Sequence, residues 1–440
     1  MQTASTLAAL VLAIASAWVA PPARATTLVV ATVDNAQMVE LQRLAPAFEK
    51  SHPDIHISWV TLGEHALRAA VRTDLETRQG QFDVVTVGLY ETPLWARRGW
   101  LVPIDTGPSY DVDDLLPPIR NGLSYRGRLY AAPFYGESSM LMYSTDLLRQ
   151  AGLRMPAQPQ WRDVAALAAR LADPRHGIFG ICLRGKAGWG ENMTLVTTMV
   201  NAFGGQWFDM TWHPQLASAP WRQAVGLYVE LLRRYGPPNA AQMNYNANLA
   251  LFEQGKCAMW VDATVAGGYV SSARFSRVAG KVGFAPAPIA ATARGSHWLW
   301  TWALAVPADV DARHQAAAQI FVRWATSRAY VERVAASEGW GLVPSGTRES
   351  TYANPAFRAA APWGDVERDA IDSADPTRPT LPRSPYIGIQ YVAMPGYWAI
   401  GDAVGNAIRE ALLGRLSVEQ ALGQGQYAAQ RGLLAGGYPR

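Results

Sequence analysis

An alternation of apolar strands and helices over residues 26–99 constrains the fold of this chain more than any other feature. Strands are predicted at TTLVVATVDN, IHISWVTL and FDVVTVG. The segment AQMVELQRLAPAFEKSHP carries apolar residues at helical spacing, namely Met38, Leu41, Leu44 and Phe48. A second amphipathic segment, EHALRAAVRTDLETRQG, separates the later two strands. A β-α-β-α-β order requires a parallel sheet with right-handed crossovers, so an α/β protein is predicted.

The carboxyl ends of these three strands carry polar and aromatic side chains. They are Asp34 with Asn35, Thr61 to Glu64, and Tyr90 with Glu91. In open α/β sheets, ligands bind beyond the carboxyl ends of the strands. Asn35, Glu64 and Glu91 are therefore candidate ligand contacts. Helix capping is the alternative role, because acidic and amide side chains also begin helices.

The remainder of the chain continues this mixture of strands and helices. Residues 127–148 are predicted to run extended, and further strands are predicted at GIFGICLRG, KCAMWVDA and KVGFAPAP. Helices are predicted at 161–174, 191–203, 220–235, 245–254, 312–326, 327–337, 397–413 and 417–432. The composition does not shift along the chain, so a second lobe must be interleaved with the first rather than follow it.

The stretch RGSHWLWTWALAVP, residues 294–307, places Trp298, Trp300 and Trp302 at every second position. Alternate side chains of a strand point to opposite faces, so the three indoles should share one face. Tryptophan on a strand is usually buried in the core. A surface on which a ligand stacks is the alternative.

Aromatic residues also stand beside polar ones elsewhere in the chain. The pairings are YE at 90–91, YGE at 135–137, RGKAGWGEN at 184–192 and WVD at 260–262. The C–H faces of a sugar or polyol lie on aromatic rings, while its hydroxyl groups need oriented carboxylates, amides and guanidinium groups. The pattern therefore favours a site for a carbohydrate or polyol.

Motifs of nucleophilic catalysis and of cofactor binding are absent from the sequence. It contains neither G-x-S-x-G nor a Walker A motif, and GKAGWG at 185–190 lacks the dinucleotide-binding spacing. The seven histidines are scattered, so neither a metal nor another cofactor is expected. A net charge of +4 without a basic block argues against a nucleic-acid partner. Glu137, Glu191 and Asp262 could supply a glycosidase carboxylate pair, which sequence spacing neither supports nor excludes.

Residues 1–25 have the pattern of a secretory signal peptide. LAALVLAIASAWVA, at 7–20, is too short to remain as a membrane span, and ARA at 23–25 is a small-x-small cleavage site. Cleavage after Ala25 and export to the periplasm are expected. No cysteine lies near the cleavage site, so the pattern of a lipid anchor is absent.

Cys182 and Cys257 are the only cysteines. In an exported chain they could form a disulfide. The alternative is two buried free thiols, because sequence does not show how far apart the two Cα atoms lie.

Five segments carry a resemblance to a known family. They are QFDVVTVGLYETPLWARRGWLVPID, YAAPFYGESSMLMYSTDLL, GICLRGKAGWGEN, NANLALFEQGKCAMWVDATV and SHWLWTWALAVP. Together they resemble the extracellular solute-binding proteins, family 1, of ABC importers. GICLRGKAGWGEN and WLWTW are most similar to the branch that binds the polyols sorbitol and mannitol. The resemblance extends over essentially the whole chain after residue 25.

The resemblance implies a two-lobed periplasmic-binding-protein fold of type II, like that of maltose-binding protein, with three interlobe crossings. The crossings are expected near 135–140, in the tryptophan strand, and near 343–348. Lobe one is then 26–137 plus 302–345, and lobe two is 138–300 plus 347–440. A ligand would be held in the cleft, which closes by a hinge motion.

The resemblance also implies the side chains that contact the ligand. They are Asn35, Glu64, Glu91, Tyr135, Glu137, Arg184, Lys186, Trp189, Asp262, Trp298, Trp300 and Tyr386. Trp302 is expected to pack beneath lobe one instead. Three alternatives stay open: Arg184 and Asp262 pair with each other, Lys186 is solvated, and Tyr386 only packs its loop.

The expected function is capture of a polyol, sorbitol or mannitol, for delivery to an ABC permease in the inner membrane, by a monomer that performs no covalent chemistry. One alternative ligand is a cyclic monosaccharide or disaccharide. Alternatives of other classes are a secreted glycoside-active enzyme and a structural envelope protein.

Overall fold

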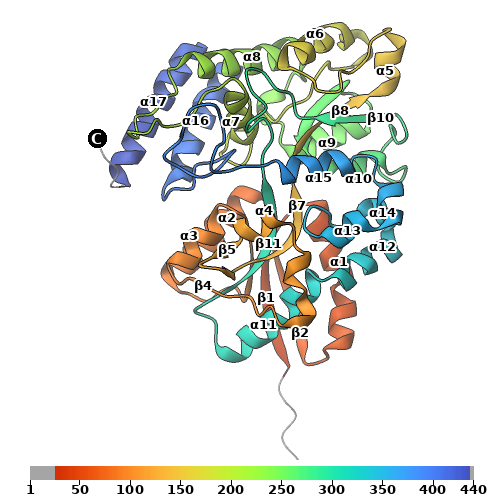
Figure 1. Cartoon of the computed structure of the whole chain (residues 1–440), viewed down its shortest axis with the longest axis vertical. Helices are drawn as coiled ribbons and strands as arrows, with labels where there is room; N and C mark the ends of the chain where they lie inside the picture. Colours follow the sequence, from red (N-terminus) through yellow and green to blue (C-terminus); the bar gives the residue numbers. More distant parts are fainter. Residues whose placement is uncertain (1–24, 437–440) are drawn as a thin grey trace, which may run out of the picture.

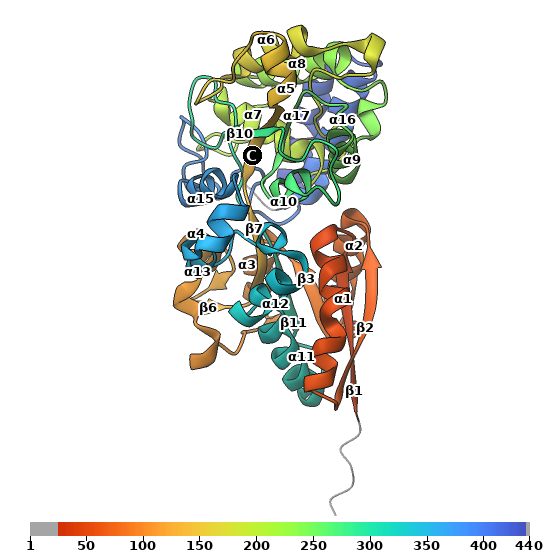
Figure 2. The same ribbon diagram turned by 90° about the vertical axis from the view of Figure 1, so that its right-hand side faces the viewer.

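The computed structural model describes residues 25–436, which form two lobes stacked along the long axis of the molecule (Figures 1 and 2). Each lobe contains a β-sheet flanked by helices, so the predicted α/β class is confirmed. The signal peptide predicted at 1–25 lies, except for its last residue, outside the described residues. None of the helices within 25–436 is both long enough and apolar enough to cross a membrane.

Lobe one is built on a sheet with the strand order β2-β1-β3-β11-β4, to which β7 adds by pairing with β11. The strands are β1 Thr26–Val33, β2 Ile55–Leu62, β3 Val84–Val87, β4 Leu101–Val102, β7 Ala132–Glu137 and β11 Trp300–Pro307. The first three are parallel, as the β-α-β-α-β pattern predicts, whereas β11 runs antiparallel to β3. Both faces of β1 are buried from Val30 to Val33, which suits the largely apolar sequence of this half of the strand.

Helices cover both faces of this sheet. They are α1 Ala36–Ser51, α2 Glu64–Thr77, α3 Glu91–Arg97, α4 Pro117–Gly122, α11 Ala312–Ala325 and α12 Arg328–Glu338. Met38, Leu41 and Phe48 are fully buried, as their spacing predicts, and the Phe48 ring packs edge-on against Phe321 at a centroid distance of 5.2 Å. Leu44 is only partly buried, because Ala45 takes the inner position.

Lobe two surrounds a three-stranded antiparallel sheet with the order β10-β8-β9. Its strands are β8 Ser139–Ser144, β9 Met259–Ala263 and β10 Val282–Pro286, and its helices are α5 Thr145–Gln150, α6 Trp161–Leu171, α7 Asn192–Ala202, α8 Ala219–Tyr235, α9 Tyr245–Glu253, α10 Ala266–Ser271, α15 Gly364–Asp372, α16 Tyr397–Leu412 and α17 Val418–Ala435. Every residue of α7 is buried, which fits a helix without charged residues.

Short elements complete the chain. The strands β5 Ser124–Tyr125 and β6 Arg128–Leu129 form a two-stranded ribbon. The helices α13 Glu349–Ala353 and α14 Pro355–Ala360 follow the third predicted crossing.

The lobes are joined where the chain changes sheets. Between β7 and β8 only Ser138 intervenes, and its hydroxyl donates to the carbonyl oxygen of Trp298, 2.6 Å away, just before β11. Beside them, the backbone N–H of Gly136 donates to the carbonyl of Ser345 at 2.9 Å. A Cβ on Gly136 would lie 2.1 Å from the carbonyl oxygen of Gly346, so only glycine permits this close approach. The residue bounds given above for each lobe stay a prediction.

Two local expectations are corrected. The predicted strand at residues 177–185 makes only isolated bridges, and of these only the bridge between Cys182 and Trp260 reaches β9. The tryptophan strand begins at Trp300, so Trp298 precedes it.

The two cysteines are joined. Cys182 and Cys257 form a disulfide with a Cα–Cα distance of 5.9 Å, which decides between the two alternatives left open by the sequence. The bond ties residues 177–185 to the chain that enters β9.

Candidate functional site

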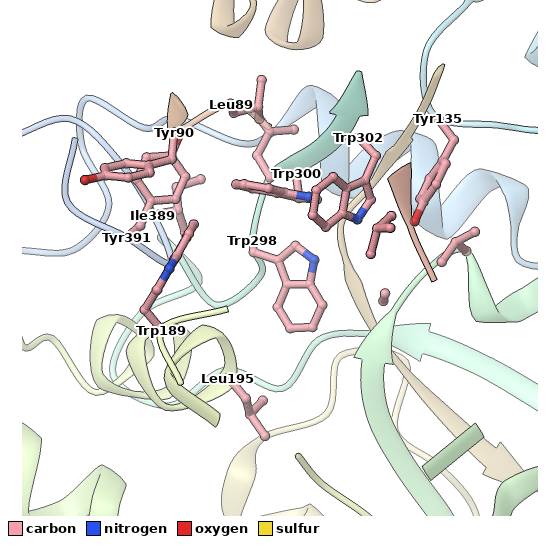
Figure 3. Close-up of a cluster of buried hydrophobic side chains, with 14 of the residues drawn as sticks. Leu89, Tyr90, Tyr135, Trp189, Leu195, Trp298, Trp300, Trp302, Ile389 and Tyr391 are labelled. Carbon is pink, nitrogen blue, oxygen red and sulfur yellow. The ribbon is translucent and has the colours of Figure 1, made fainter. Parts of the chain in front are cut away.

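A cavity of about 180 Å³ lies between the lobes, beside the strands that join them. Nine of the twelve predicted contacts line it: Asn35, Glu64, Tyr135, Glu137, Arg184, Lys186, Trp189, Trp298 and Trp300. Their participation in binding stays a prediction. Figure 3 shows indole and phenol rings from both lobes converging here.

Asn35 has the alternative role of a helix cap and also lines the cavity. Its Oδ1 accepts a hydrogen bond of 3.0 Å from the backbone N–H of Met38 and so caps α1. Its Nδ2 donates to the hydroxyl oxygen of Tyr135 at 3.0 Å. Because Tyr135 accepts this bond, its own hydroxyl hydrogen remains available to donate into the cavity. Burial, followed by the charge of Glu137, raises the pKa of Tyr135 well above its usual value, so this donor stays protonated.

Glu137 ends β7 and faces the cavity with a side chain that is almost completely buried. Burial raises its pKa from 4.5 to about 8, although Arg184 opposes this shift. At neutral pH the group is therefore a carboxylic acid, which can both donate to and accept from a hydroxyl.

Asp262, a predicted contact, does not reach the cavity. It is fully buried behind Arg184, whose Nε donates to its Oδ1 and Oδ2 at 3.0 and 3.1 Å and whose Nη2 donates to Oδ1 at 2.6 Å. Trp260 Nε1 donates to Oδ2 at 3.1 Å. The pairing alternative is thus the correct one, and Asp262 positions Arg184 instead of facing the ligand cavity.

Arg184 does line the cavity. Burial lowers its pKa, but the Asp262 carboxylate more than offsets this, so the pKa lies above its usual value. Nη1 donates to the carbonyl oxygen of Gly190 at 3.0 Å. The guanidinium has five N–H donors, so two remain beyond these bonds.

Arg68, which the sequence prediction missed, lines the cavity. Its guanidinium carbon lies 4.1 Å from the ring centroid of Trp189 and 4.9 Å from those of Trp300 and Trp302. Nη2 donates to Glu64 Oε1 at 2.9 Å. Burial disfavours the charged guanidinium, yet the neighbouring carboxylates raise the pKa of Arg68.

Glu91 is a second correction among the predicted contacts. It is buried outside the cavity, where Oε1 accepts a hydrogen bond from Arg68 and Oε2 accepts one from the backbone N–H of Gly88 at 3.2 Å. Glu91 is the first residue of α3, but the start of this helix has no side-chain capping hydrogen bond, so the carboxylate serves Arg68 and Gly88 instead.

Tyr386 is the third correction. Its hydroxyl oxygen accepts from the backbone N–H of Trp207 at 3.0 Å, its ring packs edge-on against Phe208, and it lies outside the cavity. Tyr386 therefore packs its loop, as the alternative stated.

The tryptophan prediction is partly wrong. Trp298, Trp300 and Trp302 all line the cavity, including Trp302, which was expected only to pack beneath lobe one. Trp300 and Trp302 pack edge-on, with centroids 5.5 Å apart, and each is at least nine-tenths buried. Trp300 and Trp302 therefore belong to the buried core and also form part of the cavity wall, because the cavity lies at the end of the sheet.

Lys186 lies at the rim, with its side chain 48% exposed, and pairs with Glu191 at 3.0 Å. Burial, followed by the charge of Glu64, raises the pKa of Glu191 to about 6.

Several lining residues were missed by the sequence analysis. They are Arg68, Glu191, Thr194, Asn244, Tyr245, Asn246, Trp302 and Gln390. Arg68 could have been found, since it stands four residues after Glu64 on one helix face. Gln390 has no local signal: its amide donates to the carbonyl oxygen of Leu299 at 2.7 Å, 91 residues away in sequence.

Replacing Glu137 by glutamine is expected to change how stability depends on pH. The folded-state pKa is raised from 4.5 to about 8, so the stability that protonation contributes is full below pH 4.5 and is lost as pH rises through about 8. Glutamine cannot lose a proton, so the melting temperature of Glu137→Gln should rise relative to wild type from about pH 5 to about pH 9. Thermal unfolding across this range measures the difference.

The matched control is Glu230→Gln, at an exposed pair on α8, whose difference from wild type should stay flat. A constant difference for Glu137→Gln across the same range would show that Glu137 does not titrate there.

The sequence is similar to a known protein family and to proteins whose ligands are known. Residues 34–332 match the family described as bacterial extracellular solute-binding protein. The chain is 50% identical over 417 residues to a mannitol-binding protein of Pseudomonas aeruginosa, which covers 94% of this chain and 95% of that protein.

Solved structures of solute-binding proteins are also similar to this chain. An ABC transporter solute-binding protein from Agrobacterium vitis S4 with bound D-mannitol is 47% identical, covers 94% of this chain and all of that one, and superposes with a TM-score of 0.92. A solute-binding protein from Agrobacterium radiobacter K84 in complex with ribitol has a TM-score of 0.82, with 93% of this chain and all of that one covered. It is 23% identical, so it supports the fold alone.

Proposed function

This chain belongs to the family of bacterial extracellular solute-binding proteins, and from that premise we propose that it captures mannitol, or a closely similar hexitol such as sorbitol, for an ABC importer. It is a binding component of transport and not an enzyme. One observation carries the proposal: an interlobe cavity lined by indoles, phenols and carboxyl groups, in a chain 47% identical to a protein with bound D-mannitol.

The chemistry of the cavity suits an acyclic polyol. Each hydroxyl of a hexitol is both a donor and an acceptor, so it needs partners of both kinds. Tyr135 offers a donor, Arg184 offers two further N–H groups, and Glu137 offers both a donor and an acceptor. Trp298 and Trp300 offer apolar faces to the carbon chain.

Residues from both lobes line the cavity, which supports closure as the signal that a ligand is bound. Asn35 and Glu64 come from lobe one, whereas Arg184 and Trp189 come from lobe two. A ligand shifts an open-to-closed equilibrium only if it binds the two states with different affinity. A polyol that spans the cavity can contact the residues of both lobes at once only in the closed state.

Membership of this family indicates where the protein acts in the cell and which kind of protein it delivers its ligand to. Export beyond the inner membrane and a permease partner are implied by membership. We further propose cleavage after Ala25, a periplasmic location and a monomeric state. Sequencing of the amino terminus of the secreted protein and analytical ultracentrifugation measure these directly.

Calorimetric titration against a panel of polyols and sugars tests the ligand. Mannitol or sorbitol should bind with a dissociation constant near the micromolar range, about −8 kcal/mol. Pentitols should bind more weakly because they lack one hydroxyl partner, and maltose should not bind. A preference for maltose or glucose over every hexitol would contradict the proposal.

A further inference from the structure

A second cavity, of about 230 Å³, lies beside the first at the interlobe boundary. Of the residues that the structure describes, only Arg68 and Trp189 line both cavities. Arg68 comes from α2 of lobe one and Trp189 from the segment that precedes α7 of lobe two. The two side chains are in contact, with the guanidinium carbon 4.1 Å from the indole centroid, so together they form a partition.

Arg68 is held firmly in this partition. Its side chain is only 14% exposed and forms ion pairs with Glu64 and Glu91. Three indole rings pack around the guanidinium. An arginine with two carboxylate partners and stacked rings does not move aside for a neutral ligand without losing all of these contacts.

The second cavity has the chemistry of a site for a sugar ring. Tyr90, Trp95 and Trp398 supply aromatic surface, and Arg72 and Asp402 supply polar groups. The Arg72 guanidinium lies 4.1 Å from the ring centroid of Trp398. Trp398 is 37% exposed, which leaves part of its surface open for stacking.

We propose that Arg68 is a specificity-determining residue that ends the ligand cavity after a single hexitol chain and closes off the second cavity, which fits the sugar ring of a glycosyl-hexitol. This inference rests on the proposed function, because it assumes that a hexitol occupies the first cavity. Without Arg68 the two cavities join beside Trp189. The wild-type protein therefore binds the free hexitol and rejects its glycoside.

The test uses the whole protein with mannitol and with maltitol, a glucosyl-hexitol, in calorimetric titrations. Wild type should bind mannitol and should prefer it to maltitol by about 100-fold or more. Arg68→Ala should bind maltitol about tenfold or more tightly than wild type does. Because this change leaves Glu91 buried without its partner, Arg68→Ala/Glu91→Gln is measured beside it, and circular dichroism checks that both variants are folded.

Trp398 provides the matched control. Trp398→Ala alone enlarges the second cavity but leaves the partition, so it should not admit maltitol. Added to Arg68→Ala, it should reduce the gained maltitol affinity about tenfold, since the ring loses its stacking surface.

The outcomes separate the two proposals. If wild type binds mannitol but neither folded Arg68 variant binds maltitol better than wild type does, Arg68 is not the specificity determinant. If Trp398→Ala alone admits maltitol, or wild type binds maltitol as tightly as mannitol, the partition is refuted. If wild type binds no hexitol, the proposed function fails and this inference fails with it.

Discussion

Replacing Asp262 by alanine is expected to lower the free energy of unfolding by about 3–5 kcal/mol. The change leaves the Arg184 guanidinium without its carboxylate partner in a site where the arginine side chain is only 8% exposed. It also removes the acceptor of the Trp260 indole N–H. Urea denaturation followed by tryptophan fluorescence measures the loss.

The same change should weaken hexitol binding at least about tenfold, or about 1.4 kcal/mol. Arg184 lines the cavity, and three of its hydrogen bonds to Asp262 set its orientation there. Asp262→Asn keeps the side-chain volume but turns one acceptor oxygen into a donor, so a smaller loss of stability is expected. Calorimetric titration of the folded fraction separates the binding effect from the stability effect.

Glu230→Ala is the matched control for the ion pair. Glu230 and Arg234 pair at 2.8 Å on the surface of α8, with side chains 51% and 64% exposed, so its loss should cost well under about 1 kcal/mol. Equal unfolding midpoints for Asp262→Ala and Glu230→Ala would mean that the buried pair stabilises the fold no more than a surface pair does.

Removal of the disulfide is expected to be similarly costly. Cys182 and Cys257 are 75 residues apart in sequence, and a cross-link over a loop of that length stabilises by about 4 kcal/mol through the unfolded chain. The double variant Cys182→Ser/Cys257→Ser should therefore unfold at a lower urea concentration than the oxidised protein. Reversible urea denaturation of both proteins measures the difference.

The disulfide also supports the cavity. Cys182 stands two residues before Arg184, and its backbone N–H donates at 2.9 Å to the carbonyl oxygen of Met259, the first residue of β9, the strand that also carries Asp262. A modest loss of hexitol affinity should thus accompany the loss of stability. Reductant should lower the midpoint of wild type but leave the double variant unchanged. A wild-type midpoint that does not move once the bond is reduced would rule out a stabilising role.

The residues at the predicted strand ends show how much of the candidate site could be predicted from local sequence patterns. Asn35 and Glu64 line the cavity because parallel strands end at one edge of the sheet, and that rule needs only element order. Glu91 follows the same rule but points at Arg68 and the backbone of Gly88. Order along the chain places a residue at an edge, whereas its partners decide which way its side chain points.

Resemblance to a family had a similar limit. It implied that Arg184 and Asp262 both contact the ligand, whereas only Arg184 lines the cavity and Asp262 is buried behind it. Arg68, which touches residues of both lobes, lay outside the quoted motifs altogether.

Hydrophobic period and residue chemistry are local properties, so the α/β class, the positions of most helices and the polar–aromatic character of the site follow from the sequence alone. Which groups face the ligand cavity depends instead on contacts between segments far apart in the chain. Asp262 is buried by an arginine 78 residues away, and Tyr386 is engaged by a backbone N–H 179 residues away. Contacts over such separations depend on how segments far apart in the chain pack within one lobe, and no local pattern predicts them.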